Sequence, residues 1–265
     1  MSPQKNGYYQ GYNLEEPDSI YDKVIKRYKE EGIRILLKKI ITYSIHRVKR
    51  FINTYSIYSI YRINYSTFNK YFNVNKKKYK YYLNTYNAID NERVVEIPIA
   101  LEFAKKHKSE KVLEIGNVLS HYVNFDHKIV DKYEIGKGVT NVDITEFNPP
   151  EKYNAIISIS TIEHVGFDEQ VKDPGKASKA IGKIINLLSE NGEALITVPL
   201  GYNPEIDTII KNEKTNLQFS QIYYLKRISR LNLWIETTME DGLSRRYGVK
   251  YPHANSIAVI IISTS

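Results

Sequence analysis

Residues 111–116 read Lys111-Val-Leu-Glu-Ile-Gly116, a short apolar run that ends at a glycine. A second run, Tyr153-Asn-Ala-Ile-Ile-Ser-Ile-Ser160, has the same apolar character. Short continuous runs of this kind are typical of strands that are buried on both faces of a sheet. The glycine after the first run would let the backbone of the following loop approach a ligand closely.

Further strands and helices are expected around these two runs. The strands are predicted at residues 128–131, 141–144, 193–198, 232–238 and 256–262, and the helices at residues 94–106 and 176–188. Strands that alternate with helices are typical of a mostly parallel α/β sheet. In such a sheet the ligand binds beyond the carboxyl ends of the strands.

Polar side chains follow four of the predicted strands, at the edge where a ligand would bind. In chain order they are Gly116 and Asn117, then Asp131, then Asp143, and finally Ser160, Thr161, Glu163 and His164. A carboxylate after the second strand can accept hydrogen bonds from both ribose hydroxyls, as in dinucleotide-binding folds. A carboxylate after the third strand can accept a hydrogen bond from an exocyclic amino group.

This ordered set resembles the class I S-adenosylmethionine-dependent methyltransferases. The resemblance is carried by Val112-Leu-Glu-Ile-Gly116, Asp131, Val142-Asp143-Ile144, Tyr153-Asn-Ala-Ile-Ile-Ser-Ile-Ser-Thr-Ile-Glu-His-Val165 and Leu187-Leu-Ser-Glu-Asn-Gly-Glu-Ala-Leu-Ile-Thr-Val198. It spans about residues 94–262 and implies a Rossmann-like, seven-stranded, mostly parallel sheet with flanking helices. In that fold the last strand runs antiparallel to its neighbours.

The resemblance also implies S-adenosylmethionine as the cofactor, held by the loop after the first strand. Carried over position by position, the expected cofactor-binding residues are Glu114, Gly116, Asn117, Asp131, Asp143, Ile144, Ser160 and Thr161. Glu114 and Gly116 would contact or shape the methionine pocket, and Asp131 would bind the ribose. Asp143 would bind the adenine amino group with Ile144 beside the ring.

Methyl transfer depends mainly on proximity and orientation, and a general base helps when the acceptor is a hydroxyl. His164 is the candidate base, and Glu163 would orient it or act as the base itself. The candidate acceptor contacts are Tyr202, Asn203, Asp207, Arg245 and Arg246. The two adjacent arginines could hold an anionic group. No spacing of His, Asp and Glu matches a metal-binding motif, so no metal is expected.

The N-terminal third differs in composition from the rest of the chain. Residues 1–90 contain 17 Lys/Arg and 7 Asp/Glu, whereas residues 91–265 contain 21 and 23. Residues 1–90 also hold 15 of the 23 tyrosines. This asymmetry predicts two parts, a basic, Tyr-rich, mainly helical region at residues 1–90 and the Rossmann-like domain at residues 91–265.

Residues 31–52 place apolar side chains at helical spacing, with Lys and Arg on the opposite face. Three interpretations stay open: a helix packed on the protein body, a helix in the interface of an anionic membrane, and a contact with nucleic acid. No known nucleic-acid-binding motif accompanies it, so nucleic acid is the least favoured partner. If the membrane interpretation holds, deleting residues 1–90 releases the protein from anionic vesicles and leaves cofactor binding intact.

The sequence therefore predicts an S-adenosylmethionine-dependent methyltransferase with a small-molecule or glycan acceptor, such as a sugar on a lipid carrier. The loop Gly116-Asn-Val-Leu-Ser120 lacks a second glycine, which favours an alternative, a degenerate methyltransferase fold that serves as a binding or scaffold module. A nucleic-acid methyltransferase that uses the basic region is a third hypothesis. The chain has no cysteine, no signal-peptide pattern and no run of 18 apolar residues. The missing signal peptide and apolar run predict a cytoplasmic protein. The basic, amphipathic residues 31–52 would place it at the inner face of the membrane.

Overall fold

A computed structural model describes residues 41, 44, 56–84, 86–108, 110–212 and 219–264. The chain divides into two compact units, Met1–Ile57 and Tyr58–Ser265. Apart from Ile41 and Ser44, the amphipathic helix expected at residues 31–52 lies outside the described residues. The second unit carries the fold that follows.

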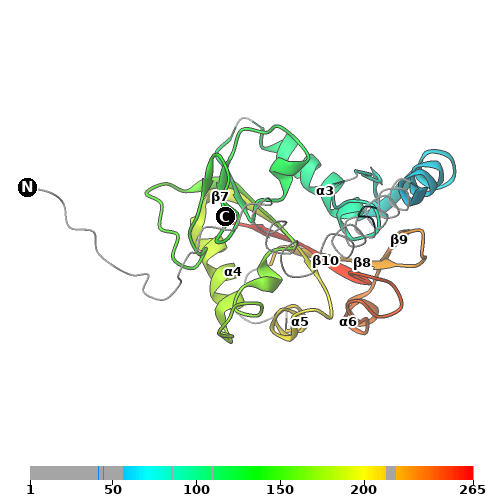
Figure 1. The fold of residues 1–265 in the computed structure, drawn as a ribbon. Helices are drawn as coiled ribbons and strands as arrows, with labels where there is room; N and C mark the ends of the chain where they lie inside the picture. Colours follow the sequence, from blue (N-terminus) through cyan, green and yellow to red (C-terminus); the bar gives the residue numbers. More distant parts are fainter. Residues whose placement is uncertain are drawn as a thin grey trace, which may run out of the picture. The chain divides into compact units, whose positions relative to one another are not determined.

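Its centre is a sheet in which the described residues form eight strands, in the order β5-β4-β3-β6-β7-β10-β8-β9 (Figure 1). The strands are β3 (Val112–Ile115), β4 (Lys128–Val130), β5 (Val139–Thr140), β6 (Tyr153–Ile159), β7 (Leu188–Pro199), β8 (Gln221–Arg227), β9 (Trp234–Thr237) and β10 (Ser256–Ser263). The run from β5 to β7 pairs in parallel. β10 is antiparallel to β7 and β8, and β9 is antiparallel to β8. The expected mostly parallel α/β sheet is confirmed.

Helices cover both faces of this sheet (Figure 1). They are α3 (Arg93–Lys106), α4 (Lys176–Leu187), α5 (Pro204–Lys211) and α6 (Met239–Leu243). Because side chains alternate between the faces of a strand, Ile156, Ile196 and Ile260 pack on the α4 side. Their neighbours Ile157, Leu195 and Val259 pack on the α3 side.

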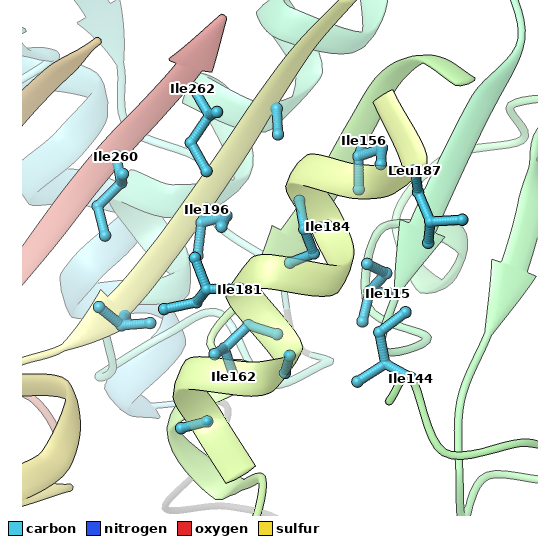
Figure 2. Close-up of a cluster of buried hydrophobic side chains, with 14 of the residues drawn as sticks. Ile115, Ile144, Ile156, Ile162, Ile181, Ile184, Leu187, Ile196, Ile260 and Ile262 are labelled. Atoms are coloured by element: carbon cyan, nitrogen blue, oxygen red, sulfur yellow. The ribbon is translucent and has the colours of Figure 1, made fainter. Parts of the chain in front are cut away.

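The α4 face shows how the sequence builds the core. Figure 2 shows Ile181 and Ile184 of α4 among Ile196 and Ile260 of the sheet. The two helix side chains are three residues apart, so they lie on the same face of the helix. Complete burial of isoleucines on both sides stabilises the layer by roughly 1.5–3 kcal/mol per side chain.

The described sheet has eight strands where seven were expected, and three strands differ from the expectation. β7 was expected at residues 193–198 but begins at Leu188, where it pairs with Tyr153 of β6. β8 was not predicted, because its apolar run is only four residues long and lies between Gln221 and Lys226. The third strand was expected at residues 141–144 but is β5, at Val139–Thr140. The extended chain ends there because the Asp143 carboxylate accepts hydrogen bonds from the amide and hydroxyl of Thr145 and so forms a turn.

Residues 58–83 pack as part of the second unit. A helical segment leads into a π-helical turn, η1 (Asn64–Phe68), and then into a hairpin of β1 (Tyr71–Val74) and β2 (Lys77–Lys80). Tyrosine hydroxyls of this segment donate hydrogen bonds to backbone carbonyls of the chain that leads into β9. Tyr61 and Tyr65 donate to the carbonyls of Arg230 (2.7 Å) and Asn232 (2.9 Å).

These hydrogen bonds are made beside an edge of the eight-stranded sheet, where β9 lies. β9 is the outer strand, and the hydroxyl of Tyr81 contacts both the amide and the carbonyl of Trp234, at 2.8 and 3.3 Å. The composition changes at residue 90, whereas the second compact unit begins at Tyr58.

Among the described residues, every helix is too short or too polar to cross a bilayer.

Candidate functional site

A cavity of about 470 Å³ lies at the carboxyl ends of β3, β4, β5 and β6. Chain connections leave β3 in one direction toward β4 and β5, and the sheet continues on the other side through β6. The cavity therefore lies at the switch point of the parallel sheet, where open α/β folds bind ligands. Of the expected cofactor-binding residues, seven line it: Gly116, Asn117, Asp131, Asp143, Ile144, Ser160 and Thr161.

The loop after β3 is held close to the end of β4. Gly116 has a φ of +82° and donates its amide to the carbonyl of Val130 (2.8 Å). The amide of Asn117 donates to Oδ2 of Asp131 (3.0 Å). The other carboxylate oxygen, Oδ1, accepts from the amides of Tyr133 (2.8 Å) and Glu134 (2.7 Å). Asp131 thus joins the two loops that form this wall of the cavity.

Glu114 lies below the cavity and does not line it. Its side chain is completely buried, and Oε1 accepts hydrogen bonds from the amides of Val118 (2.9 Å) and Leu119. These amides begin the short 3₁₀ helix η2 (Leu119–His121). Oε2 lies 2.5 Å from Nε2 of His127. Burial alone would lower the pKa of His127, but the Glu114 carboxylate outweighs it and raises that pKa.

An ion-pair cluster occupies the opposite wall. Oδ2 of Asp143 lies 2.7 Å from Nζ of Lys176 and 3.0 Å from Nζ of Lys132. Both lysines also contact Glu169, at 2.7 and 3.1 Å. Burial alone would raise the pKa of Asp143, but hydrogen bonds from Lys176, Thr145 and Lys132 hold it well below its usual range. Each oxygen of Asp143 already has two donors.

Ser160 and Thr161 come from the end of β6, where the backbone is strained. Ser160 has a φ of +37°, which is rare for a residue other than glycine. Its hydroxyl donates to the buried carboxylate of Glu96 on α3 (2.6 Å), and Glu96 pairs with Arg93 (2.9 Å). Thr161 packs directly against Gly116. The floor between β3 and β6 is therefore fixed by packing and by a buried carboxylate.

His164 lines the cavity and belongs to a second cluster. Its Nδ1 contacts Oδ2 of Asp168, and the same oxygen accepts the hydroxyl of Tyr202 (2.5 Å). The rings of His164 and Tyr202 meet edge to face at 5.2 Å. A carboxylate at Nδ1 orients an imidazole so that Nε2 can accept a proton. Nε2 lies 3.6 Å from Oε1 of Glu163.

Glu163 is buried beside His164 and does not line the cavity. Burial raises its pKa well above the usual value, and within the described chain its Oε2 has no hydrogen-bond partner. A raised pKa means that this carboxyl keeps its proton to a higher pH than an ordinary glutamate does.

Removing the Tyr202 hydroxyl tests the link between Tyr202 and Asp168. Burial alone would raise the pKa of Asp168, but hydrogen bonds from Tyr202 and His164 outweigh it and lower that pKa. We expect Tyr202→Phe to raise the pKa of Asp168, because one donor to its charged form is lost. Carboxyl-carbon NMR titration measures this shift. Tyr247→Phe is the control, since that ring packs on Tyr202 at 4.9 Å, and an equal shift in both variants would contradict the assignment.

The structure places the remaining acceptor candidates away from the cavity lining. Asn203 is buried and caps α5, accepting from the amide of Glu205 (2.9 Å). Asp207 accepts from the amide of Gly201 (3.1 Å). Arg245 pairs with Asp241 (2.9 Å), and Arg245 and Arg246 line a separate cavity of about 390 Å³. Among the five, Tyr202 alone contacts a residue that lines the main cavity.

Sequence reasoning missed the two lysines that neutralise Asp143. Lys132 follows Asp131 directly, so its position next to the site was readable, but Lys176 comes from the start of α4. Glu96 on α3 was also missed, because a glutamate in a predicted helix gives no sign that it will be buried under Ser160. Within the described residues no three His, Cys, Asp or Glu side chains are grouped to hold a metal ion.

The fold is Rossmann-like α/β, with a cavity at the switch point of its sheet. Neither a protein-family model nor a curated protein sequence matches the chain. Among solved structures, it is similar to the N-methyltransferase NodS from Bradyrhizobium japonicum WM9 in complex with S-adenosyl-L-homocysteine. The identity is 11%, the TM-score is 0.39, and the match covers 66% of this chain and 92% of that one.

Two further structures give similar values. One is a SAM-dependent methyltransferase from Archaeoglobus fulgidus, with 14% identity, a TM-score of 0.40 and coverage of 63% of this chain and 91% of that one. The other is an rRNA methylase from Streptococcus thermophilus, with 12% identity, a TM-score of 0.40 and coverage of 64% and 97%. Similarity at this level establishes no activity, which has to be inferred from the residues of the site.

Proposed function

We propose that this chain is an S-adenosylmethionine-dependent methyltransferase that acts on a small-molecule or glycan acceptor. The observation that carries the proposal is the cavity at the switch point, where Gly116, Asp131 and Asp143 from three successive strand ends line one space. Its volume, about 470 Å³, lies in the range of cofactor sites. S-adenosylmethionine would supply a methyl group activated by the positive charge on sulfur.

The residues of the cavity fit such a cofactor in three respects. A side chain at Gly116 would overlap Thr161, so the glycine keeps the loop and the end of β6 in contact and leaves the space above them open. The Asp131 carboxylate, at the end of β4, would accept the ribose hydroxyls. Val130, Val142 and Ile144 add an apolar surface for a flat ring.

Within this proposal His164 is the general base for a hydroxyl acceptor. Asp168 contacts Nδ1 and would hold the imidazole with Nε2 toward the reacting group. Tyr202 would keep Asp168 in place through its 2.5 Å hydrogen bond. Glu163 would lie behind the imidazole, where burial raises its pKa and so favours its neutral form.

Calorimetric titration with S-adenosylmethionine and S-adenosylhomocysteine tests the cofactor site. We expect micromolar binding of both by the full chain, weakened at least about tenfold by Asp131→Ala, because hydrogen bonds to a charged carboxylate are worth roughly 1.5–3 kcal/mol. Asp126→Ala, at an exposed carboxylate that does not line the cavity, is the control and should bind like the parent. If both variants bind the two ligands equally weakly, Asp131 has no specific role in cofactor binding.

A second function, a binding or scaffold module with a degenerate site, is favoured by one observation. Both oxygens of Asp143 are already occupied by Lys132, Lys176 and Thr145, so an adenine amino group would have to displace one of these donors. The same titration separates the two functions. Absence of heat with both ligands would favour the scaffold and rule out the methyltransferase.

For the acceptor, we propose a sugar on a lipid carrier, with the enzyme in the cytoplasm and residues 31–52 at the anionic inner face of the membrane. The support is the basic, amphipathic sequence of residues 31–52. We expect deletion of residues 1–57, the first of the two compact units, to abolish co-sedimentation with phosphatidylglycerol vesicles. S-adenosylhomocysteine binding should survive the deletion. Vesicle binding that persists without residues 1–57 would argue against this anchor.

A further inference from the structure

A second cavity, of about 600 Å³, lies in the segment between residues 58 and 83. It is formed by the helical turns before β1, by the start of β1 and by the chain that leaves β2. None of its lining residues lines the cavity at the switch point. Nothing in the methyltransferase proposal gives this cavity a role.

Its floor is made of fixed aromatic rings. Tyr65 and Tyr81 are buried and stacked, with ring centroids 4.5 Å apart and an interplanar angle of 8°. The Tyr65 hydroxyl donates to the carbonyl of Asn232 (2.9 Å), and the Tyr81 hydroxyl accepts from the amide of Trp234 (2.8 Å). Because both hydroxyls are engaged, the rings are held in place before any ligand arrives.

Its rim carries positive charge. Arg62, Lys70 and Lys80 line the cavity with exposed side chains, and its lining among the described residues includes no acidic side chain. In the described part of the chain none of the three forms an ion pair. Lys77, on the same hairpin, differs in being paired with Glu102.

The absence of acids extends beyond the cavity. Residues 58–83 contain six Lys/Arg and no Asp or Glu. Unpaired cations around a concave, partly apolar surface focus a positive potential into it, which favours an anion. Phosphate suits such a mixed site, because arginine binds it as a fork and the lysines bind it as point charges.

We propose that this cavity binds the phosphate or diphosphate group of a small ligand, with Arg62, Lys70 and Lys80 on the phosphate and the tyrosine floor beneath the rest of the molecule. A volume of about 600 Å³ accommodates a ligand of the size of a sugar phosphate or a nucleotide. One local cavity fits a compact ligand better than a nucleic-acid strand, which needs an extended track of charge and aromatic rings.

Titration of the full chain with inorganic pyrophosphate tests the proposal. We expect binding at low ionic strength that is weakened at least about tenfold by the double substitution Arg62→Ala and Lys80→Ala, since two charge-assisted contacts are lost. Both side chains are exposed, so folding should be unaffected. The matched control is Lys105→Ala with Lys108→Ala, which removes the same charge from exposed positions outside the cavity and should change the affinity less than about twofold.

Two sources of the phosphate are distinguished with phosphatidylglycerol vesicles. If the vesicles compete with pyrophosphate for the full chain, the cavity takes a lipid headgroup. If pyrophosphate binding is unchanged on chains that residues 31–52 hold at the vesicle surface, the ligand is a soluble phosphoester. Either result supports a phosphate site.

Three outcomes would overturn the proposal. The first is the absence of pyrophosphate binding, and the second is equal weakening in the two double variants, which would indicate a general charge effect. The third is binding of a single-stranded RNA that depends on Arg62 and Lys80 while pyrophosphate does not bind, which would assign the surface to nucleic acid. S-adenosylhomocysteine binding, measured on the same variants, should be unchanged, so failure of this proposal is distinguishable from failure of the cofactor site.

Discussion

Gly116→Ala is expected to destabilise the protein by about 3 kcal/mol and to abolish S-adenosylhomocysteine binding. A Cβ at this position would overlap Oγ1 of Thr161 and come within 2.6 Å of its Cγ2. Thr161 is β-branched, and its hydroxyl donates to the carbonyl of Ile159 (3.0 Å), so it cannot rotate away freely. Overpacking costs roughly 1–3 kcal/mol, and a left-handed backbone costs a further ~1–2 kcal/mol for a residue with a side chain.

Gly138→Ala separates the two contributions. Gly138 has nearly the same backbone conformation, with a φ of +84°, but a Cβ there meets nothing within 4 Å. It should lose only the backbone contribution, about 1–2 kcal/mol. Urea denaturation gives both free energies of unfolding, and calorimetry gives the affinities. If the two variants lose the same stability and both still bind S-adenosylhomocysteine, the contact between Gly116 and Thr161 is not what shapes the cavity.

The second large effect is expected at Glu114. Glu114→Ala should cost 3–5 kcal/mol, roughly the cost of breaking a buried ion pair by removing one partner. The substitution leaves the imidazolium of His127 and the amides of Val118 and Leu119 without their acceptor. The loop that begins η2 should lose its position, and cofactor binding should be lost with it.

The pH dependence identifies the role of His127. Because the pKa of His127 is raised in the folded state, its contribution to stability is fully present below about pH 6.5, its unfolded pKa. That contribution is lost as the pH rises through the folded pKa. We therefore expect the free energy of unfolding of the parent protein to fall over this range, measured by urea denaturation at successive pH values.

Glu114→Gln is the matched variant. The amide oxygen can still accept from Val118 and Leu119, and the amide nitrogen can donate to a neutral imidazole. We expect its deficit relative to the parent to shrink as the pH rises, whereas that of Glu114→Ala persists because the two amides stay unpaired. A deficit in Glu114→Gln that is the same at pH 6 and pH 9 would exclude His127 as the source of the pH dependence.

Much of the cavity could be foreseen because it is built from strand ends. Gly116, Asp131 and Thr161 follow apolar runs that are readable as buried strands, and the carboxyl ends of parallel strands meet at one edge. Asp143 was also placed at that edge, although the strand before it is shorter than expected.

What could not be foreseen depends on packing between distant segments. Lys176 reaches Asp143 from α4, and Glu96 reaches Ser160 from α3, and neither pairing leaves a trace in local spacing. Asn203 is different. The sequence around it indicates a helix start, but Asn203 was predicted to contact the acceptor. Asn203-Pro-Glu205 is the pattern of a helix start, with a capping side chain, a proline in the first turn and an acid after it.

The tyrosine hydroxyls around β9 protect the molecule against edge-to-edge aggregation. An outer strand normally offers unpaired backbone groups on which another chain can build a further strand. Here the Tyr81 hydroxyl forms hydrogen bonds with both the backbone amide and the backbone carbonyl of Trp234. The backbone amide of Asn75 donates to the carboxylate of Glu236 (3.2 Å). A chain that begins at residue 91 would expose the edge of β9, and we expect it to self-associate in analytical sedimentation. A chain that begins at residue 58 would keep this edge covered and should stay monomeric.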